Sequence, residues 1–216
     1  MGRGYSSLLA VLLVAVCRTA AATTFTAEIT DQDGKPVANA VVSLVPDPKS
    51  GMPGASMRLP NEQRIDQRLE TFIPIVTIVP RSGRVVFANS DPTTHQVYSF
   101  SPVKQFEITL ARDTSSPPIV FQTAGVAALG CNIHDHMIAY VFVADSPWTV
   151  LTGSDGRAVI EGVPPGSYQA QVWHYRYPPR RELPSARIAV STDTTRWAAN
   201  IRVLTRSGTR SHAGSY

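Results

Sequence analysis

The sequence has few cysteines, few charged residues and no long apolar run. Two of its 216 residues are cysteine and 17% are charged. Two thiols are too few for a disulfide scaffold, and no apolar run reaches the roughly 20 residues that a membrane span requires. The apolar content of 43% is ordinary for a globular protein, so a wholly disordered chain is also excluded.

The first cysteine lies in an N-terminal segment that is typical of a secretory signal peptide. Arg3 precedes an apolar stretch from Leu8 to Cys17, and the small residues Ala20 to Ala22 follow as a cleavage site. An uncleaved membrane anchor would require a longer apolar run. We therefore expect residues 1–22 to direct export to the periplasm and to be removed, which leaves no integral membrane segment.

The mature chain then keeps one cysteine, Cys131, in an oxidising compartment where it has no partner for an internal disulfide. Such a thiol is expected to be a buried core residue, a reactive group or a metal ligand. Removal of residues 1–22 also lowers the net charge of +4, because it removes two arginines and no acid. The sequence contains no stripe of Lys and Arg, so no nucleic-acid partner is expected.

Short β-branched runs separated by Gly, Pro, Asp and Asn predict an all-β sandwich, and helical periodicity is scarce. The expected strands are Phe25–Thr30, Ala40–Val45, Ile73–Val79, Arg84–Ala88, Gln96–Ser101, Phe106–Leu110, Ile119–Phe121, Gly125–Leu129, Ala139–Ala144, Ala158–Ile160, Ser167–His174, Ala186–Val190 and Ala198–Val203. The segment Pro46–Pro60, rich in Pro, Gly and Ser, is expected to be a linker, and residues 204–216 a disordered tail.

Turn motifs on both sides of the middle of the chain suggest how it is divided into domains. The stretch Asp31 to Pro36, the Asp155-Gly156-Arg157 turn and the stretch Val163 to Tyr168 together resemble the carboxypeptidase regulatory-like (transthyretin-like) β-sandwich. Residues 23–47 are too few to bury a core alone. We expect them to pair with residues 148–203 in one Ig/transthyretin-like sandwich, interrupted by a domain inserted at residues 61–146. Two domains in series are the alternative.

Residue types that bind metals gather within the middle segment. Cys131, His134 and Met137 follow an expected strand with C-x2-H-x2-M spacing, and His95 comes from an earlier loop that begins at Asn89. A blue-copper site takes two imidazoles and one thiolate, with a weak axial thioether. The soft sulfur ligands suit Cu(I), and imidazole accepts both oxidation states. The pattern therefore predicts one copper ion held by these two loops.

The same segment resembles the cupredoxin family. Its loop has the spacing seen in amicyanin, and the sequence from Phe72 through Asn89 to His95 is similar to the cupredoxin strand pair before the first histidine ligand. His95–Pro102 and Gly130–Asp135 are similar to secreted cupredoxin-like proteins labelled methylamine utilisation protein. The resemblance to cupredoxins covers about residues 64–145. It implies a Greek-key β-sandwich and a type 1 copper site.

Carried over to this chain, the resemblance implies that His95, Cys131 and His134 are equatorial ligands and that Met137 is the axial ligand. Each candidate ligand also has a structural interpretation. A lone cysteine is usually a small core residue, and Met137 could be one too. His136 could replace Met137 as a ligand or face solvent. Asn89 could form a turn or brace the ligand loop.

One-electron transfer is the leading functional hypothesis, with a redox partner protein docking near His134 on an apolar rim of Pro92, Met137 and Ile138. Periplasmic copper delivery or sensing without redox turnover, or a structural binding module, are the alternatives. The second sandwich favours these alternatives more than a lone copper domain would. We expect His174, in the other domain, to have a packing or surface role.

We do not expect an enzyme. A cysteine–histidine hydrolase usually takes its base and the orienting third group from distant segments, whereas Cys131 and His134 share one tight loop. A multicopper oxidase or a copper nitrite reductase would need further histidine clusters, and the whole chain has 5 histidines.

Overall fold

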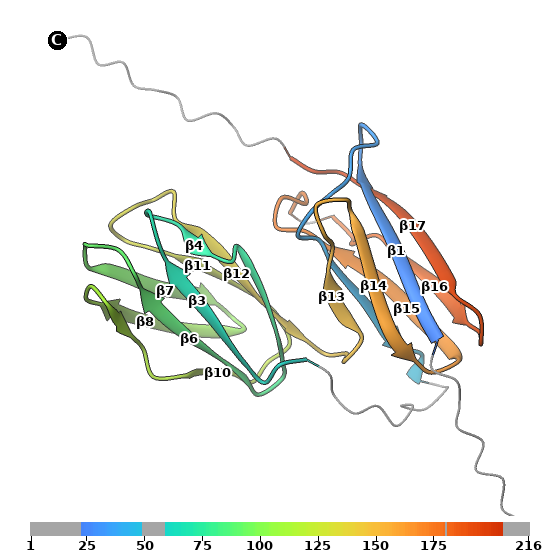
Figure 1. Ribbon diagram of the computed structural model, residues 1–216, viewed down its shortest axis with the longest axis horizontal. Helices are drawn as coiled ribbons and strands as arrows, with labels where there is room; N and C mark the ends of the chain where they lie inside the picture. Colours follow the sequence, from blue (N-terminus) through green and yellow to red (C-terminus); the bar gives the residue numbers. More distant parts are fainter. Residues whose placement is uncertain (1–22, 49–58, 180, 205–216) are drawn as a thin grey trace, which may run out of the picture.

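The structure is a computed structural model that describes residues 23–48, 59–179 and 181–204. The expected signal peptide (1–22), most of the expected linker and residues 205–216 lie outside these ranges. The described residues form strands β1 to β17 and no α-helix, which confirms the predicted all-β fold (Figure 1). Within these same ranges, no helix has the length and apolarity of a membrane span.

The middle of the chain, residues 62–144, folds into a sandwich of two sheets, drawn at the left of Figure 1. One sheet has the order β10-β6-β3-β4, with β9 beside β6, and the other has the order β5-β12-β11-β7-β8. The strand bounds are β3 (Glu62–Gln67), β4 (Phe72–Ile73), β5 (Val76–Pro80), β6 (Gly83–Asn89), β7 (His95–Ser101), β8 (Lys104–Leu110), β9 (Thr114–Ser115), β10 (Ile119–Phe121), β11 (Gly125–Gly130) and β12 (Ile138–Ala144).

Alternating apolar residues fill the core of this sandwich, because every second side chain of a strand points to the same face. Val85 and Phe87 of β6 are fully buried, and so are Ala127 and Leu129 of β11. Two candidate ligands, Cys131 and Met137, belong to the same buried cluster. The candidate site therefore lies against the core and not on a flat surface.

The remaining strands form a second sandwich, drawn at the right of Figure 1. Its sheets have the orders β14-β1-β17 and β13-β2-β15-β16. The strand bounds are β1 (Thr23–Asp31), β2 (Val41–Pro46), β13 (Thr149–Leu151), β14 (Arg157–Val163), β15 (Gly166–Trp173), β16 (Ser185–Val190) and β17 (Thr195–Ile201). Both sheets thus combine a strand that precedes the first sandwich in the sequence with strands that follow it.

Two of the Asp-Gly turns noted in the sequence lie in this second sandwich. Asp31 Oδ1 accepts hydrogen bonds from the backbone N–H groups of Asp33 and Lys35. Gly156 has a φ of +74°, and a Cβ atom there would lie 2.5 Å from the carbonyl oxygen of Ile29. Only glycine fits that position without strain. The carboxypeptidase regulatory-like family assignment of this sandwich stays a prediction.

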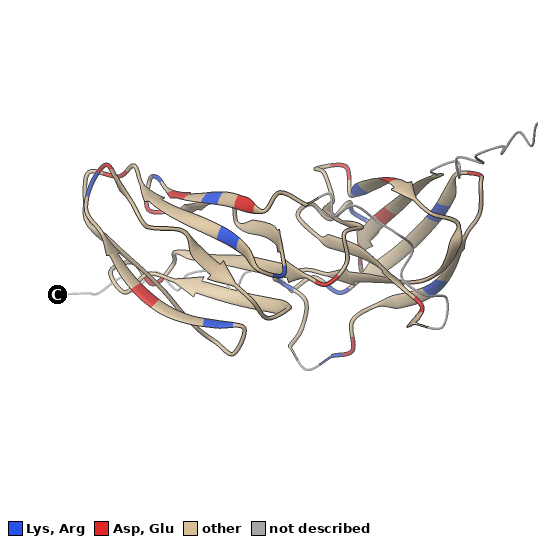
Figure 2. Ribbon diagram, turned by 90° about the horizontal axis from the view of Figure 1, so that it is seen from below, with Lys and Arg blue, Asp and Glu red and all other residues tan. Residues whose placement is uncertain are grey.

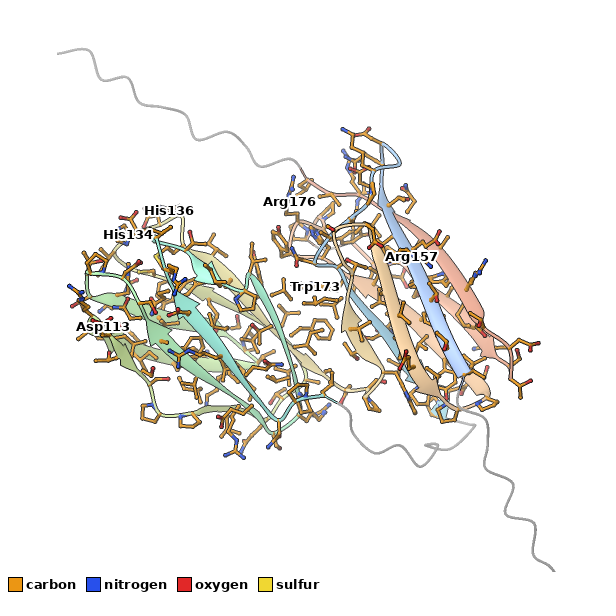
Figure 3. All side chains as sticks on the ribbon, in the orientation of Figure 1. Asp113, His134, His136, Arg157, Trp173 and Arg176 are labelled. Carbon is orange, nitrogen blue, oxygen red and sulfur yellow. The ribbon has the colours of Figure 1, made fainter. Side chains whose placement is uncertain are left out.

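A third apolar cluster joins the two sandwiches. Buried Val76 of β5 packs in it together with buried Val41 of β2. The ring of Trp173 lies 5.6 Å from the ring of Tyr140 and 5.7 Å from that of Phe142, measured between centroids. Figure 3 shows Trp173 between the two sandwiches. The second sandwich therefore covers the outer face of the sheet that contains β5 and β12.

The strand pattern in the sequence misses three strands, β3, β9 and β13, and misplaces β17, which was expected at Ala198–Val203. The single strand expected at Ile73–Val79 is also wrong, because the chain there forms β4 and β5, which belong to different sheets. Strand β3 is mostly polar and buries one apolar residue, Ile65. Leu204, expected as the first residue of a disordered tail, donates a hydrogen bond from its backbone N–H to the carbonyl of Arg176 at 2.9 Å. Leu204 is therefore tied to the second sandwich rather than being part of a disordered tail.

Candidate metal centre

Three of the four predicted ligands come together at one end of the first sandwich. His95 is the first residue of β7, Cys131 directly follows β11, and His134 lies in the loop between β11 and β12. One ligand atom from each of these residues lies within 4.8 Å of the other two. Figure 3 shows His134 at this end of the sandwich. The pairing of β11 with β7, through Gly130 and Tyr98, brings the two loops side by side.

The donor atoms fit a bound metal ion. Cys131 Sγ lies 3.7 Å from His95 Nδ1, and both residues are buried. First-row metal bonds of about 2.0 Å to imidazole and about 2.3 Å to thiolate, opened to roughly 120°, would separate nitrogen and sulfur by about 3.7 Å. His134 Nδ1 is also buried and has no hydrogen-bond partner among the described residues. A metal ion would satisfy that nitrogen, which otherwise carries a desolvation cost.

The outer nitrogen of His95 is held by a buried carboxylate. His95 Nε2 lies 2.9 Å from Asp91 Oδ2, and the two side chains are 0% and 5% exposed. Burial alone would raise the pKa of Asp91, but hydrogen bonds from the Glu70 N–H, the His95 ring and the Leu69 N–H more than offset it and lower the pKa below 3.8. A charged carboxylate at this position fixes the orientation of the His95 ring. It also leaves the lone pair of His95 Nδ1 available to a metal ion.

Asn89 braces the loop that carries Asp91 and His95. Its side-chain Nδ2 donates to the carbonyls of Thr93 and Leu110 at 2.8 and 3.0 Å. Its Oδ1 accepts a hydrogen bond from the backbone N–H of Asp91 at 3.0 Å. Of the two roles considered for Asn89, the structure therefore shows the brace.

The loop between β11 and β12 closes on itself through a hydrogen bond from the Met137 N–H to the His134 carbonyl at 2.9 Å. The Met137 side chain is 1% exposed and packs in the same core cluster as Cys131. Its burial excludes Met137 from the expected exposed rim of Pro92, Met137 and Ile138. Ile138, at 48% exposed, and Pro92 face solvent. An axial ligand role for Met137 stays a prediction.

His136 and a residue that the sequence did not single out, Glu70, lie beside His134. The His136 side chain is 61% exposed, and its Nε2 is 3.7 Å from Glu70 Oε2. The other carboxylate oxygen, Oε1, is 3.4 Å from His134 Nε2. No local sequence pattern predicts Glu70 at the site, because its contact arises from the turn between β3 and β4.

His174 lies in the second sandwich and takes no part in this cluster. Its Nδ1 accepts a hydrogen bond from the backbone N–H of Arg176 at 3.2 Å. The side chain is buried, and burial is the largest cause that lowers its pKa, to about 4. The expected packing role agrees with this environment.

No protein-family model and no curated protein matches the chain. Among solved structures, it is similar to a copper-containing nitrite reductase from Thermus scotoductus, at 20% identity and a TM-score of 0.37 over 44% of this chain. The chain spans only 25% of that reductase. It is also similar to a purple cupredoxin from Nitrosopumilus maritimus, at 19% identity and a TM-score of 0.35, over 38% of this chain and 98% of that one.

A third similar structure is a reduced amicyanin variant, at 17% identity and a TM-score of 0.35, over 48% of this chain and 98% of that one. None of these three proteins carries the methylamine utilisation label, so that finer resemblance stays a prediction. Each is a protein to which part of this chain is similar.

Proposed function

We propose that the chain is a periplasmic type 1 (blue) copper protein that transfers one electron at a time. One copper ion would be held by His95, Cys131 and His134, with Met137 as the axial ligand. The observation that carries this proposal is the buried Nδ1 of His134, which has no partner among residues 23–48, 59–179 and 181–204 and lies beside a buried thiol and a second imidazole. Two nitrogen donors and a thiolate are the donor set that a blue-copper site requires.

Copper, when bound, would supply a one-electron couple between Cu(II) and Cu(I). The chain's own residues would keep the site in one geometry for both states. Asp91 holds the ring of His95, and the core around Cys131 excludes water from the thiolate. The side chain of His134 is 22% exposed, which makes it the ligand nearest to solvent and the natural point of contact for a partner.

A redox partner protein would dock at this exposed end of the site. Exposed apolar side chains lie around this end: Leu69, at 85%, in the β3–β4 turn, Ile133, at 53%, in the loop between β11 and β12, and Ile138, at 48%, at the start of β12. Small apolar contacts of this kind suit transient encounters between electron carriers. Over the described residues of both sandwiches, Lys and Arg are mixed with Asp and Glu (Figure 2), and we expect no nucleic-acid partner. We propose no enzymatic reaction.

Periplasmic location rests on residues 1–22, whose composition is that of a cleaved signal peptide. The second sandwich would be a carboxypeptidase regulatory-like domain interrupted by the copper domain, because its sheets combine β1 and β2 with β13 to β17.

The absorption spectrum of the mature protein loaded with Cu(II) tests the proposal. Thiolate-to-copper charge transfer should give an intense blue colour that Cys131→Ser abolishes, while His136→Ala should keep it. Colourless metal binding that survives Cys131→Ser would contradict a type 1 site. A reversible one-electron couple supports electron transfer, and fast loss of copper to a chelator without redox cycling supports a delivery protein instead.

Substitution of the axial position forms a second arm of this experiment. Met137→Gln should retain the blue colour and lower the reduction potential, because an oxygen donor favours Cu(II) more than a thioether does. If Met137→Gln changes neither spectrum nor potential, Met137 is not a ligand, and His136→Ala then shows whether that imidazole takes its place.

A further inference from the structure

The turn between β3 and β4 has an unusual backbone for its sequence. The N–H of Arg68 donates to the carbonyl of Thr71 at 3.0 Å, and the N–H of Thr71 donates to the carbonyl of Arg68 at 3.1 Å. The two residues between them, Leu69 and Glu70, have φ values of 50° and 52°. Two-residue hairpin turns with positive φ at both positions prefer Asn-Gly, and larger side chains there are strained. Strain of this kind is often found at functional sites.

The carboxylate of Asp91 stabilises this strained turn. Asp91 Oδ1 accepts a hydrogen bond from the Leu69 N–H at 2.5 Å, and Oδ2 accepts one from the Glu70 N–H at 2.9 Å. The same Oδ2 lies 2.9 Å from His95 Nε2. One buried carboxylate therefore orients a candidate ligand and also holds the backbone from which the Glu70 side chain extends.

The Glu70 side chain reaches the outer edge of the other candidate histidine. Its Oε1 lies 3.4 Å from His134 Nε2, a separation slightly longer than a typical hydrogen bond. Glu70 is 53% exposed and His134 is 22% exposed. The inner nitrogen of His134, Nδ1, is buried and has no hydrogen-bond partner in the part of the chain that the structure describes. The two nitrogens of this ring thus face a carboxylate on one side and the candidate metal position on the other.

We propose that Glu70 is a positioning residue for His134; the redox part of this inference rests on the copper function proposed above. Its carboxylate keeps the proton of His134 on Nε2, so that Nδ1 presents a lone pair to the metal. A carboxylate behind a ligand imidazole also raises the basicity of that ligand. Glu70 therefore favours Cu(II) over Cu(I) and lowers the reduction potential of the site.

The histidine tautomer in the metal-free, full-length protein tests the positioning role without copper. Nitrogen-15 NMR of labelled histidine should show His134 of the wild type protonated on Nε2. Glu70→Ala should give a mixture of the two tautomers, whereas Glu70→Gln, which keeps an acceptor oxygen, should retain the Nε2–H form. His136→Ala removes the other contact of Glu70 and should leave the His134 tautomer unchanged. An unchanged tautomer in Glu70→Ala would overturn the positioning role.

The reduction potential of the copper-loaded protein tests the electrostatic part. Glu70→Gln and Glu70→Ala should each weaken the preference for Cu(II) by up to about tenfold, which raises a one-electron potential by up to about 59 mV. Glu70→Asp keeps the charge, so its reduction potential should lie close to that of the wild type. Equal potentials in the wild type, Glu70→Gln and Glu70→Ala would overturn this part. If the wild type binds no copper, the proposed function fails, while the tautomer result still decides the role of Glu70.

Discussion

At the scale of single residues, Asp91 connects more of the candidate site than any ligand does. It accepts hydrogen bonds from two N–H groups of the β3–β4 turn and contacts the ring of His95. An asparagine of the same shape can accept only through one oxygen, so at least one of these donors loses its partner. We expect Asp91→Asn to lower the free energy of unfolding by about 1–3 kcal/mol and the copper affinity by about 10–100-fold.

Chemical denaturation and competition with a copper chelator measure these two quantities. Asp113→Asn is the matched control, because Asp113 is exposed and has a φ of 57°, which asparagine tolerates. The control should change the free energy of unfolding by less than about 0.5 kcal/mol and leave the affinity unchanged. If Asp91→Asn behaves like the control, Asp91 does not position His95.

The residues of the site differ in how far the sequence predicts them. Cys131 and His134 are predictable because their spacing within one loop is itself a ligand pattern, and His95 because a typical loop sequence precedes it. The structure brings these three together, while their ligation stays a prediction. Glu70 is unpredictable because a polar turn residue carries no signal of its own, and the contact depends on the long-range pairing of β3 with β6.

At the scale of elements, His174 links the end of β15 to the loop before β2. Its pKa is lowered to about 4, first by burial and then by the charge of Arg176, while a hydrogen bond to the backbone of Ala38 acts in the opposite direction. A histidine is close to 6.5 when unfolded. The unfolded chain therefore binds a proton that the folded chain does not between these two values, and stability is full above pH 6.5 and falls as the pH decreases towards 4.

We expect His174→Gln to reduce this pH dependence. One proton of difference corresponds to a slope of at most about 1.4 kcal/mol per pH unit, and the variant should lose much of that slope between pH 6.5 and pH 4.5. Denaturant titrations of the metal-free protein at several pH values measure it. His136→Gln replaces an exposed histidine of the first sandwich and should keep the wild-type slope. Equal slopes for His174→Gln and the wild type would show that His174 protonates as easily in the folded state.

The sequence pattern misses strands that are stabilised by pairing with distant segments of the chain and not by apolar residues of their own. β13 is three residues long and pairs with β2, more than 100 positions away in the chain. β3 has one buried apolar residue, Ile65, and its parallel pairing with β6 supplies the rest. The strands on either side of the ligand loop, β11 and β12, are predicted correctly because each has a short apolar run of its own.

At the scale of the whole molecule, the sequence of β12 carries a signal of the contact between the sandwiches. β12 is apolar on both faces: Val141 faces the core of the first sandwich, while Tyr140 and Phe142 face Trp173. A strand in a sandwich with one solvated face should alternate with polar residues. The apolar outer face of β12 therefore indicates a second covering layer, which the second sandwich supplies.

This arrangement couples the second sandwich to the strand that leaves the candidate site. Tyr140 stands three positions after Met137 and stacks on Tyr175 with 5.5 Å between ring centroids. Ser146, in the short connection from β12 to β13, is buried and donates a side-chain hydrogen bond to the carbonyl of Leu44 in β2. The two sandwiches are thus joined by packing and by a fixed connection, and we expect them to unfold together.

Removal of the Trp173 side chain should make the two sandwiches unfold separately. Trp173→Ala deletes the ring that contacts Tyr140 and Phe142. We expect it to lower the free energy of unfolding by about 3 kcal/mol, at the lower end of the range for a tryptophan truncation, because the ring is only partly buried.

Hydrogen exchange with mass spectrometry, followed along a denaturant titration, gives separate unfolding midpoints for peptides of each sandwich. Trp197→Ala is the matched control, since Trp197 is also partly buried but packs on the core of the second sandwich alone. The midpoints of the two sandwiches should coincide in the wild type, shift together in Trp197→Ala and separate in Trp173→Ala. Coincident midpoints in Trp173→Ala would mean that the aromatic contact does not couple the sandwiches, and that the second sandwich does not stabilise the strand that leaves the metal loop.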